Sequence, residues 1–370
     1  MVVNVDWFFL SHRLPVALGA LRAGHEVHVA TSLTQGREKL ESYGFIVHPI
    51  AVDRSAAGPI ELLRLFFSLL TIFWQVRPDV LHLVTIKPIL IGGVAARLSP
   101  VRGVVYAVSG LGHVFVADGW LGHLRRKLVG AWYRFVLGAQ NMRIIFQNPD
   151  DRREIESLVP LDPAQVVMIP GSGVDLGLYR PAPVPTGVPV VLMASRLLAT
   201  KGTREYVAAA QLLRAQGVRA KFLLVGDPDP DNPASIPAVE LERWAEAGEV
   251  TLLGHQAEMA SLMSCAHVVV LPSYREGLPK VLIEAAACGR AVVTTDVPGC
   301  REAIAPGVTG VLVPPKNARA LADAIRSLLS DPKACETMGR EGRRRAEQMF
   351  DVSVVVRTHL DIYQAVGRRD

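Results

Sequence analysis

The chain has 370 residues, with 40 Lys and Arg against 35 Asp and Glu, and a formal net charge of +5. Half of its residues are hydrophobic and a fifth are charged, as in a globular protein. This length is typical of two domains, and the small charge excess argues against a dedicated nucleic-acid-binding protein but suits a phosphate ligand or an anionic membrane surface.

The chain shows no pattern typical of a signal peptide. Its longest apolar stretch, residues 60–76, carries Glu61, Arg64 and Gln75, and is too short and too charged to predict a membrane-spanning helix. The four cysteines form no Cys-x-x-Cys pair, which favours buried free thiols in a reducing compartment. We therefore expect a cytoplasmic protein that can lie against the inner face of the plasma membrane.

Strands and helices alternate along the first half of the chain, and residues 6–13 between the first two elements read as a loop or the start of a helix. Strands are expected at residues 1–5, 26–31, 45–50, 80–84, 104–108, 143–147 and 166–169. Helices are expected at residues 14–23, 37–43, 60–76, 89–98, 121–137 and 150–158.

A stretch rich in proline and glycine, residues 170–186, interrupts this alternation, and we place the domain linker near its end. Further strands are expected at residues 188–194, 221–225, 250–253, 268–272, 291–295 and 310–313. Further helices are expected at residues 203–216, 237–247, 259–265, 283–288, 301–304, 318–329, 332–349 and 352–366.

This alternation predicts an α/β protein with two doubly wound, Rossmann-like domains facing a cleft. We expect an N-terminal domain over residues 1–180 and a C-terminal domain over residues 181–350. The last helix, in residues 351–370, is expected to pack back on the N-terminal domain. In sheets of this type ligands bind at the carboxyl ends of the strands.

Two glutamates in the second domain, Glu276 and Glu284, lie on either side of a glycine, a proline and an apolar run. A buried strand precedes them, and the run predicts a helix with Pro279 in its first turn and Gly289 just past its end. Free N–H groups at the start of this helix can hold a phosphate, and carboxylates beside it suit sugar hydroxyl groups. A surface glutamate beside a helix-facing one is the alternative.

Two cations, Arg196 and Lys201, follow the first strand of the second domain, where the chain turns at Gly202 into a helix. An arginine binds phosphate in a forked geometry and a lysine binds it as a point charge. These residues therefore favour phosphate binding near the two glutamates, and a pair of solvated cations in an ordinary loop is the alternative.

Taken together, these residues resemble the retaining glycosyltransferases of the GT-B fold, in the large family 4 group. In that group a strand is followed by Arg, four residues and Lys-Gly, and later by Glu-x7-Glu. The lead-in at residues 272–277 and the run at residues 169–175 also match the group, although Ser172 stands where the group usually has Asn. Residues 6–15, 85–88 and 109–113 resemble a subgroup that transfers sugars onto polyprenyl-diphosphate-linked saccharides.

The resemblance implies a role for each residue of the second domain. Arg196 and Lys201 would neutralise the donor diphosphate as it leaves. Glu276 would bind hydroxyl groups of the transferred sugar, and Glu284 those of the ribose. The pair Gly277 and Leu278 would let the backbone approach the phosphate.

The first domain offers less specific candidates. The resemblance implies that His113 faces the donor sugar, and a loop histidine without a ligand is the alternative. His12 and Arg13 follow the first strand, where the acceptor or its diphosphate could bind, and a pair at the start of a helix is the alternative. Lys87 beside a proline is a similar case.

Two other features admit plainer explanations. Residues 227–231 contain Asp-x-Asp twice, a spacing that holds metals in other transferases, but the group uses cationic side chains instead, so we interpret them as a solvated loop and expect no metal or other cofactor. The basic run at residues 125–127 lies near aromatic residues and suits contact with an anionic membrane, whereas a solvated helix face is the alternative.

The sequence thus predicts a retaining glycosyltransferase that moves a hexose or N-acetylhexosamine from a nucleotide sugar, favouring a UDP-sugar. The acceptor expected from the resemblance is an undecaprenyl-diphosphate-linked saccharide of surface-glycan or glycoprotein assembly. No nucleophile stands out, which agrees with the same-face mechanism that the resemblance implies, in which the leaving phosphate helps to deprotonate the acceptor hydroxyl. A GT-B nucleotide-sugar epimerase and a non-catalytic sugar-nucleotide-binding protein are the alternatives, and no nucleic-acid partner is expected.

Overall fold

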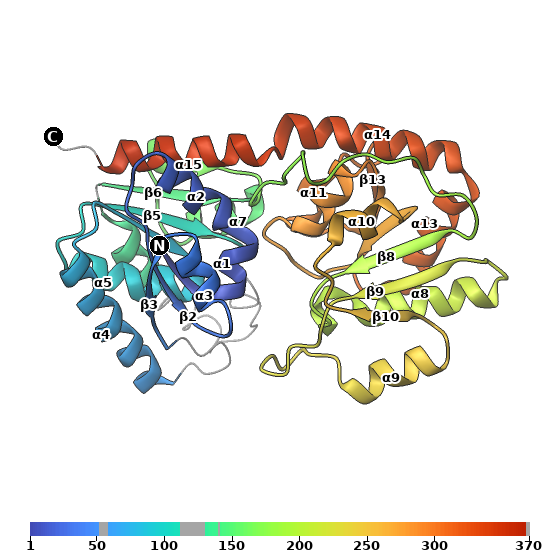
Figure 1. Cartoon of the computed structure of the whole chain (residues 1–370), viewed down its shortest axis with the longest axis horizontal. Helices are drawn as coiled ribbons and strands as arrows, with labels where there is room; N and C mark the ends of the chain where they lie inside the picture. Colours follow the sequence, from blue (N-terminus) through green and yellow to red (C-terminus); the bar gives the residue numbers. More distant parts are fainter. Residues whose placement is uncertain (52–57, 112–129, 140, 368–370) are drawn as a thin grey trace. The chain divides into compact units, whose positions relative to one another are not determined.

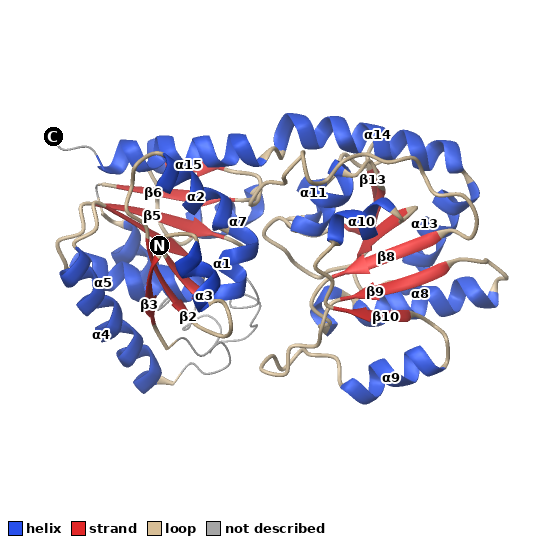
Figure 2. Cartoon of the chain, viewed as in Figure 1, coloured by secondary structure: helices blue, strands red, loops and turns tan. Residues whose placement is uncertain are grey.

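The computed structural model describes residues 1–51, 58–111, 130–139 and 141–367. The chain forms two compact units: unit 1 comprises Met1–Ser172 with Ser353–Asp370, and unit 2 comprises Gly173–Val352. Each unit contains a parallel sheet with helices packed against it (Figures 1 and 2). The predicted class of two doubly wound α/β domains is confirmed, and the division falls after Ser172, before the predicted residue 180.

Unit 1 has a seven-stranded parallel sheet whose strand order reverses direction between β1 and β4. In spatial order its strands are β3 (Ile46–Pro49), β2 (His28–Ser32), β1 (Val2–Val5), β4 (Val80–Val84), β5 (Gly103–Val108), β6 (Met142–Phe146) and β7 (Val166–Met168). Its helices include α1 (Asp6–His12), α2 (Leu14–Arg22), α3 (Arg37–Ser42), α4 (Pro59–Val76), η1 (Pro88–Gly92), α5 (Gly93–Arg97), α7 (Pro149–Glu156), η2 (Pro163–Gln165) and α15 (Val352–Gly367).

Unit 2 has a six-stranded parallel sheet in which the corresponding reversal lies between β8 and β11. In spatial order its strands are β10 (Thr251–Gly254), β9 (Lys221–Val225), β8 (Val190–Ala194), β11 (Val268–Leu271), β12 (Ala291–Thr295) and β13 (Gly310–Val313). Its helices are η3 (Ala199–Lys201), α8 (Thr203–Ala215), α9 (Ala238–Glu246), α10 (Met259–Ser264), α11 (Lys280–Ala287), α12 (Cys300–Ala303), α13 (Ala318–Ser330) and α14 (Pro332–Met349).

The central strands of unit 1 are buried on both faces, as near-continuous apolar runs require. In β5, Val104 and Tyr106 join a hydrophobic cluster that includes the inner side of α4. The alternate residues Val105 and Ala107 join a second cluster with α2 and α15. Alternation along one strand therefore fills two separate cores, one on each side of the sheet.

The last helix, α15, packs on unit 1 although unit 2 precedes it in the chain. The Tyr363 hydroxyl lies 2.6 Å from His82 Nδ1 of β4, and the Asn141 side-chain amide donates to the Val366 carbonyl at 2.8 Å. At Gly103, a Cβ atom would clash with the Val366 backbone, so the glycine allows the helix to lie directly against β5. One side of the sheet of unit 1 is thus covered by α15, whose residues follow unit 2 in the sequence.

The predicted strands are found within one or two residues, but some predictions about helices and cysteines were wrong. Residues 6–12 form α1, where a loop or helix start was expected, and the predicted helix at 89–98 begins as the π-helical turn η1. Of the predicted helix at 121–137, residues 130–137 are helical and the rest lies outside the described residues. All four cysteines are free, but Cys265 is exposed where a buried thiol was expected.

Candidate active site

The candidate site of unit 2 lies at the carboxyl ends of β8 and β11, the neighbouring strands between which the strand order reverses. Arg196 and Lys201 follow β8, and Glu276 follows β11. In open α/β sheets ligands bind outside the carboxyl ends of the strands at such a point. The topology therefore brings together the predicted cations and the first predicted glutamate.

Gly202 makes the close approach of these two loops possible. Its φ of 75° lies in the left-handed region, and a Cβ atom there would clash with the Pro272 carbonyl. The Tyr274 backbone N–H donates to the Thr200 carbonyl at 3.0 Å and joins the loops, and the Ser273 hydroxyl oxygen lies 3.2 Å from the same carbonyl. These contacts hold Lys201 next to Glu276.

Lys201 and Glu276 form an ion pair with an Nζ–Oε1 distance of 2.5 Å. The Ser273 hydroxyl donates to the same carboxylate oxygen at 2.6 Å. The side chains of Lys201 and Glu276 are 21% and 12% exposed, so the pair is only partly screened by water. An anion arriving at Lys201 would therefore meet a cation that is already held in position.

Arg196 is paired with Asp229, whose carboxylate Oδ2 lies 2.7 Å from Nη1. Asp229 is buried, and the Ser235 hydroxyl accepts a hydrogen bond from its backbone N–H at 2.9 Å. The interpretation of this loop as solvated is therefore wrong for Asp229, although Asp227 and Asp231 are exposed. Across the described residues, no three His, Cys, Asp or Glu side chains gather as metal ligands would.

Helix α11 begins at Lys280, three residues before the predicted helix at 283–288, and Pro279 is its N-cap where a first-turn position was expected. Its Glu284 carboxylate is buried and lies 3.2 Å from Lys280 Nζ. Burial raises the pKa of Tyr179, and the adjacent Glu284 carboxylate, within hydrogen-bonding reach, raises it further. Glu284 lies one turn after the start of α11, and the first turn of this helix provides free backbone N–H groups.

The loop that leads into α11 is supported from behind by α12. A Cβ atom on Gly299, whose φ is 82°, would lie 2.5 Å from the carbonyl oxygens of both Glu276 and Gly277. The Gly299 backbone N–H donates to the Glu302 carboxylate at 2.6 Å. Gly277 and Leu278 are buried in this packing, so the backbone of the loop has little freedom to move.

The predicted residues of unit 1 occupy different environments. Arg13 is 2% exposed, and its guanidinium donates to the Ser109 hydroxyl at 2.9 Å. His12 stacks on Phe8 with ring centroids 4.3 Å apart. Lys87 is half-buried and lies directly before η1, and His113 lies outside the described residues, as does the basic run at 125–127.

The surroundings of Arg13 are buried and polar. His82 and His359 have ring centroids 5.6 Å apart, and one ring nitrogen of each, Nε2, has no hydrogen-bond partner. Burial, followed by the positive charge of Arg13, lowers the pKa of His359 to about 3. Burial likewise lowers the pKa of Arg13 to about 10. Arg13 therefore contributes to packing inside unit 1, and its guanidinium does not face a soluble ligand.

Sequence reasoning missed three residues at or near these sites. Asp229 is marked by the Asp-x-Asp spacing, which was read for metal binding and not as a partner for Arg196. Thr85, at the carboxyl end of β4, has a φ of 74°, an uncommon strained geometry for a β-branched residue. Asp6 is buried and accepts hydrogen bonds from the backbone N–H groups of Thr34 and Gly36, contacts that no local pattern reveals.

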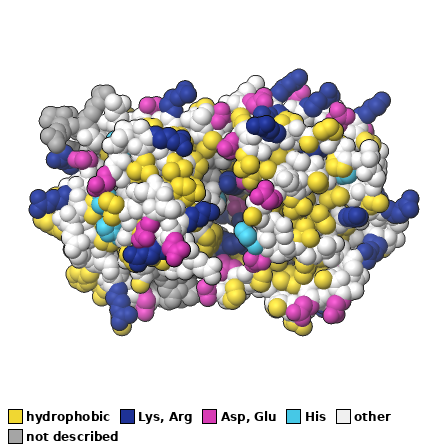
Figure 3. Space-filling view, viewed as in Figure 1, with side chains coloured by type: hydrophobic (Ala, Val, Ile, Leu, Met, Phe, Trp, Pro, Cys, Tyr) yellow, Lys and Arg dark blue, Asp and Glu magenta, His cyan; other side chains and the backbone are white. Residues whose placement is uncertain are grey.

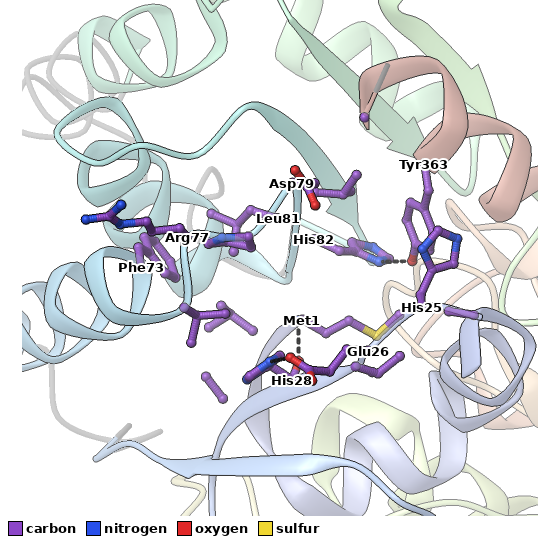
Figure 4. A pocket seen from close by; sticks show the side chains of 18 of the residues that line it. Met1, His25, Glu26, His28, Phe73, Arg77, Asp79, Leu81, His82 and Tyr363 are labelled. Atoms are coloured by element: carbon purple, nitrogen blue, oxygen red, sulfur yellow. Dashed lines mark hydrogen bonds and ion pairs between the residues drawn. The ribbon is translucent and has the colours of Figure 1, made fainter. Parts of the chain in front are cut away.

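A cavity of about 510 Å³ lies elsewhere in unit 1, and Figure 4 shows several of the side chains that line it. Its lining includes His28, His82 and Tyr363, together with residues at the amino ends of β1, β2 and β4. The residues His12 and Lys87 follow the carboxyl ends of β1 and β4, at the opposite edge of the sheet. This cavity is therefore separate from the candidate site.

Known proteins match the chain in both units. Residues 1–147 match the family "Glycosyl transferase 4-like", and residues 188–331 match "Glycosyl transferases group 1". A Campylobacter jejuni protein described as N,N'-diacetylbacillosaminyl-diphospho-undecaprenol alpha-1,3-N-acetylgalactosaminyltransferase is 28% identical, over 97% of this chain and 98% of its own.

Solved structures agree with the observed fold. A Rickettsia africae glycosyltransferase superimposes with a TM-score of 0.79 at 18% identity, over 100% of this chain and 99% of its own. The Anabaena protein HepE, in complex with UDP and glucose, superimposes with a TM-score of 0.74 at 19% identity, over 97% of each chain. With family models matching most of both units, the chain is a glycosyltransferase of the GT-B fold and belongs to the glycosyl transferase 4-like and group 1 families.

Proposed function

We propose that this glycosyltransferase moves a hexose or N-acetylhexosamine from a UDP-sugar to an undecaprenyl-diphosphate-linked saccharide, with retention at the anomeric carbon. The observation that carries the proposal is the convergence of Arg196, Lys201 and Glu276 at the strand-order reversal of unit 2. The printed activity of the Campylobacter relative supports the lipid-linked acceptor, and the UDP complex of the Anabaena structure supports the donor class.

In this proposal the donor diphosphate binds between the two loops that follow β8 and β11. Arg196 and Lys201 neutralise the negative charge that develops on the leaving phosphate. Both cations are already oriented by carboxylates, Asp229 and Glu276, so little rearrangement is needed when the ligand arrives. The phosphate that leaves accepts the proton of the acceptor hydroxyl on the same face of the sugar.

The remaining residues of unit 2 recognise the rest of the donor. Glu276 binds hydroxyl groups of the transferred sugar, because it lies beside the diphosphate site, and Glu284 binds the ribose hydroxyl groups. The backbone at Gly277 and Leu278 approaches the phosphate at the start of α11, where free N–H groups and the helix dipole favour an anion. No metal is required for this arrangement, since two cationic side chains supply the positive charge.

Unit 1 is proposed to bind the acceptor at the carboxyl ends of β1 and β4, with His12 and Lys87 as contacts and His113 as a contact to the donor sugar. Arg13 is omitted from this site because its guanidinium is buried against Ser109. A lipid-linked acceptor places the enzyme in the cytoplasm at the inner face of the membrane, and no nucleic-acid partner is involved.

The proposal is tested by thermal unfolding in the presence of UDP, GDP and a panel of their sugar derivatives. A ligand at about 100 times its Kd stabilises the folded state by about 2.7 kcal/mol, which raises the Tm by several degrees. We expect this shift with one class of UDP-sugar. Failure of every nucleotide sugar to raise the Tm would overturn the proposal.

The roles of the two glutamates are separated by kinetics. Glu284→Ala should weaken donor binding, seen as a smaller Tm shift and a higher KM, because the ribose contact contributes to the bound ground state. Glu276→Ala should mainly lower kcat, because its contact is to the sugar that reacts. Equal loss of donor binding in both variants would contradict this division.

A further inference from the structure

Helix α4 is apolar on two opposite sides. Leu65, Leu69 and Phe73 recur every four residues and are buried in the core of unit 1. Other large apolar residues are 51–62% exposed and lie along the opposite side of the helix; they are Ile60, Leu63, Phe67 and Trp74. A surface helix of a globular protein normally has a polar outer side, so this outer stripe requires an explanation.

The exposed surface extends beyond α4. The Trp74 indole N–H donates to the Leu98 carbonyl at 3.0 Å, and Leu98 is itself 55% exposed. Next along the surface, the Arg97 guanidinium lies 4.9 Å from the centre of the Phe135 ring, which is 50% exposed. We call this surface the outer apolar face; it consists of Ile60, Leu63, Phe67, Trp74, Leu98, Trp132 and Phe135.

The exposure of Trp74 and Trp132 is not explained by a need of their indole N–H groups for water. The Trp132 N–H donates to the Leu90 carbonyl at 3.1 Å, as the Trp74 N–H does to Leu98, yet both rings remain about half exposed. Figure 3 shows hydrophobic side chains exposed in the region of unit 1 where Figure 1 draws α4. An amphipathic ring with its N–H already bonded suits an apolar or interfacial environment.

Charge around this face is mainly positive. Arg64 lies on the exposed side of α4, Arg77 follows its last residue, and Arg97 and Arg134 lie on the neighbouring helical segments; all four are exposed. Glu61 is the acidic residue on the described exposed side of α4. A second copy of this chain would present the same arginines, so a symmetric contact would bring like charges together. An anionic lipid surface has the complementary charge.

By length and composition alone α4 could cross a membrane, with a mean hydropathy of 1.4 over 18 residues, so the expectation that this stretch is too short and too charged was wrong. Its inner side excludes this, because Leu65, Leu69 and Phe73 belong to the core that covers the sheet. A helix that keeps one side on its own domain and exposes apolar residues with flanking arginines fits the plane of a lipid interface.

We propose that the outer apolar face of unit 1 docks onto the surface of an anionic lipid bilayer, with α4 lying in the plane of the interface. In a parallel sheet, the connection from β3 to β4 starts at the edge where strands end. The start of α4, with Ile60 and Leu63, is therefore nearest to the edge that carries His12 and Lys87. This inference goes beyond the proposed function, which requires a lipid-linked acceptor but no particular docking surface.

Vesicle flotation tests the proposal with the full chain. Vesicles of phosphatidylcholine with phosphatidylglycerol should carry the protein upward at low salt, and vesicles of phosphatidylcholine alone should carry less. The double variant Leu63→Gln, Phe67→Gln should reduce the bound fraction roughly tenfold or more, because two large side chains no longer enter an apolar phase. The variant Arg64→Gln, Arg97→Gln should reduce the preference for anionic lipid.

A matched control replaces two exposed valines of unit 2, Val239→Gln and Val308→Gln, which should float like the unchanged protein. Equal flotation of the Leu63 and Phe67 variant, or no flotation of the unchanged protein, would overturn the proposal. A change of molar mass in solution caused by that variant, without a change in flotation, would instead assign the face to a second copy of the chain.

An activity assay in detergent separates this inference from the proposed function. With a water-soluble, short-chain prenyl-diphosphate saccharide as acceptor, Leu63→Gln, Phe67→Gln should transfer sugar at the rate of the unchanged protein. If the unchanged protein transfers sugar to this acceptor but does not float, docking is refuted and the proposed function stands. Flotation without transfer to any such acceptor would refute the proposed acceptor and leave docking standing.

Discussion

The buried and partly buried cations of the two units are held in opposite ways. In unit 2, Lys201 and Arg196 each have a carboxylate partner and remain partly exposed. In unit 1, Arg13 is almost completely buried, its hydrogen bond goes to the Ser109 hydroxyl, and its Nε has no partner. The unit 2 cations therefore suit the proposed binding of the donor diphosphate, whereas Arg13 is packed in the interior of unit 1 near Tyr363 of α15.

The largest effect on activity is expected from Lys201→Ala. Removal of one group that stabilises developing charge costs about 10²–10³-fold in kcat. Steady-state transfer from a UDP-sugar measures this loss. Arg204→Ala is the control, because Arg204 lies in the same unit and forms an exposed ion pair with Glu240. A loss of similar size in the control would show that the comparison of the two units is wrong.

Arg13→Ala is expected to reduce stability and to leave the response to the donor unchanged. Loss of a large buried side chain should reduce the free energy of unfolding of unit 1 by about 2–4 kcal/mol. The Tm shift caused by a UDP-sugar should remain, because Arg13 lies outside the donor site of unit 2. Urea denaturation with and without the ligand measures both quantities. An unchanged stability with a lost ligand response would reverse the roles assigned to the two cations.

The free energy of unfolding of unit 1 should depend on pH through its two buried histidines, His82 and His359. Burial lowers the pKa of His359 to about 3 and that of His82 well below its usual value, so the unfolded chain binds more protons below about pH 6.5. The stabilising contribution is complete above that pH and is lost as the pH falls toward 3. Each histidine then reduces the free energy of unfolding by about 1.4 kcal/mol per pH unit.

Denaturation curves at several pH values between 7.5 and 5 measure this slope. His359→Leu should lower it, because one group that takes up a proton on unfolding is removed. A slope that is unchanged by this substitution would place the responsible groups elsewhere.

The smallest effect is expected from Asp229→Asn. Arg196 is 41% exposed, and an ion pair of this kind contributes modestly, so the donor KM should rise about two- to fivefold with kcat nearly unchanged. Glu240→Gln, which removes the partner of Arg204, should change neither constant. A large fall in kcat would mean that Asp229 acts on the reaction itself and does more than orient Arg196.

The sequence predicted most of the fold because buried parallel strands are local apolar runs separated by turn residues. The cations and glutamates of unit 2 were predictable for a similar reason, since each lies within a few residues of a strand that positions it. The burial of Arg13 was not predictable, because the side chains that surround it, including His359 and Tyr363, follow it by more than three hundred residues. The pairing of Asp229 with Arg196 likewise joins two loops that no local pattern connects.

The position of α15 has a consequence for biosynthesis. A ribosome releases residues 1–172 first, but the helix that covers His82 and one face of this sheet is made only after unit 2. Unit 2 is contiguous from Gly173 to Val352 and can fold while the end of the chain is still being made. The domain that is synthesised first is therefore completed second, and until α15 is made the sheet of unit 1 lacks the apolar residues that cover one of its faces.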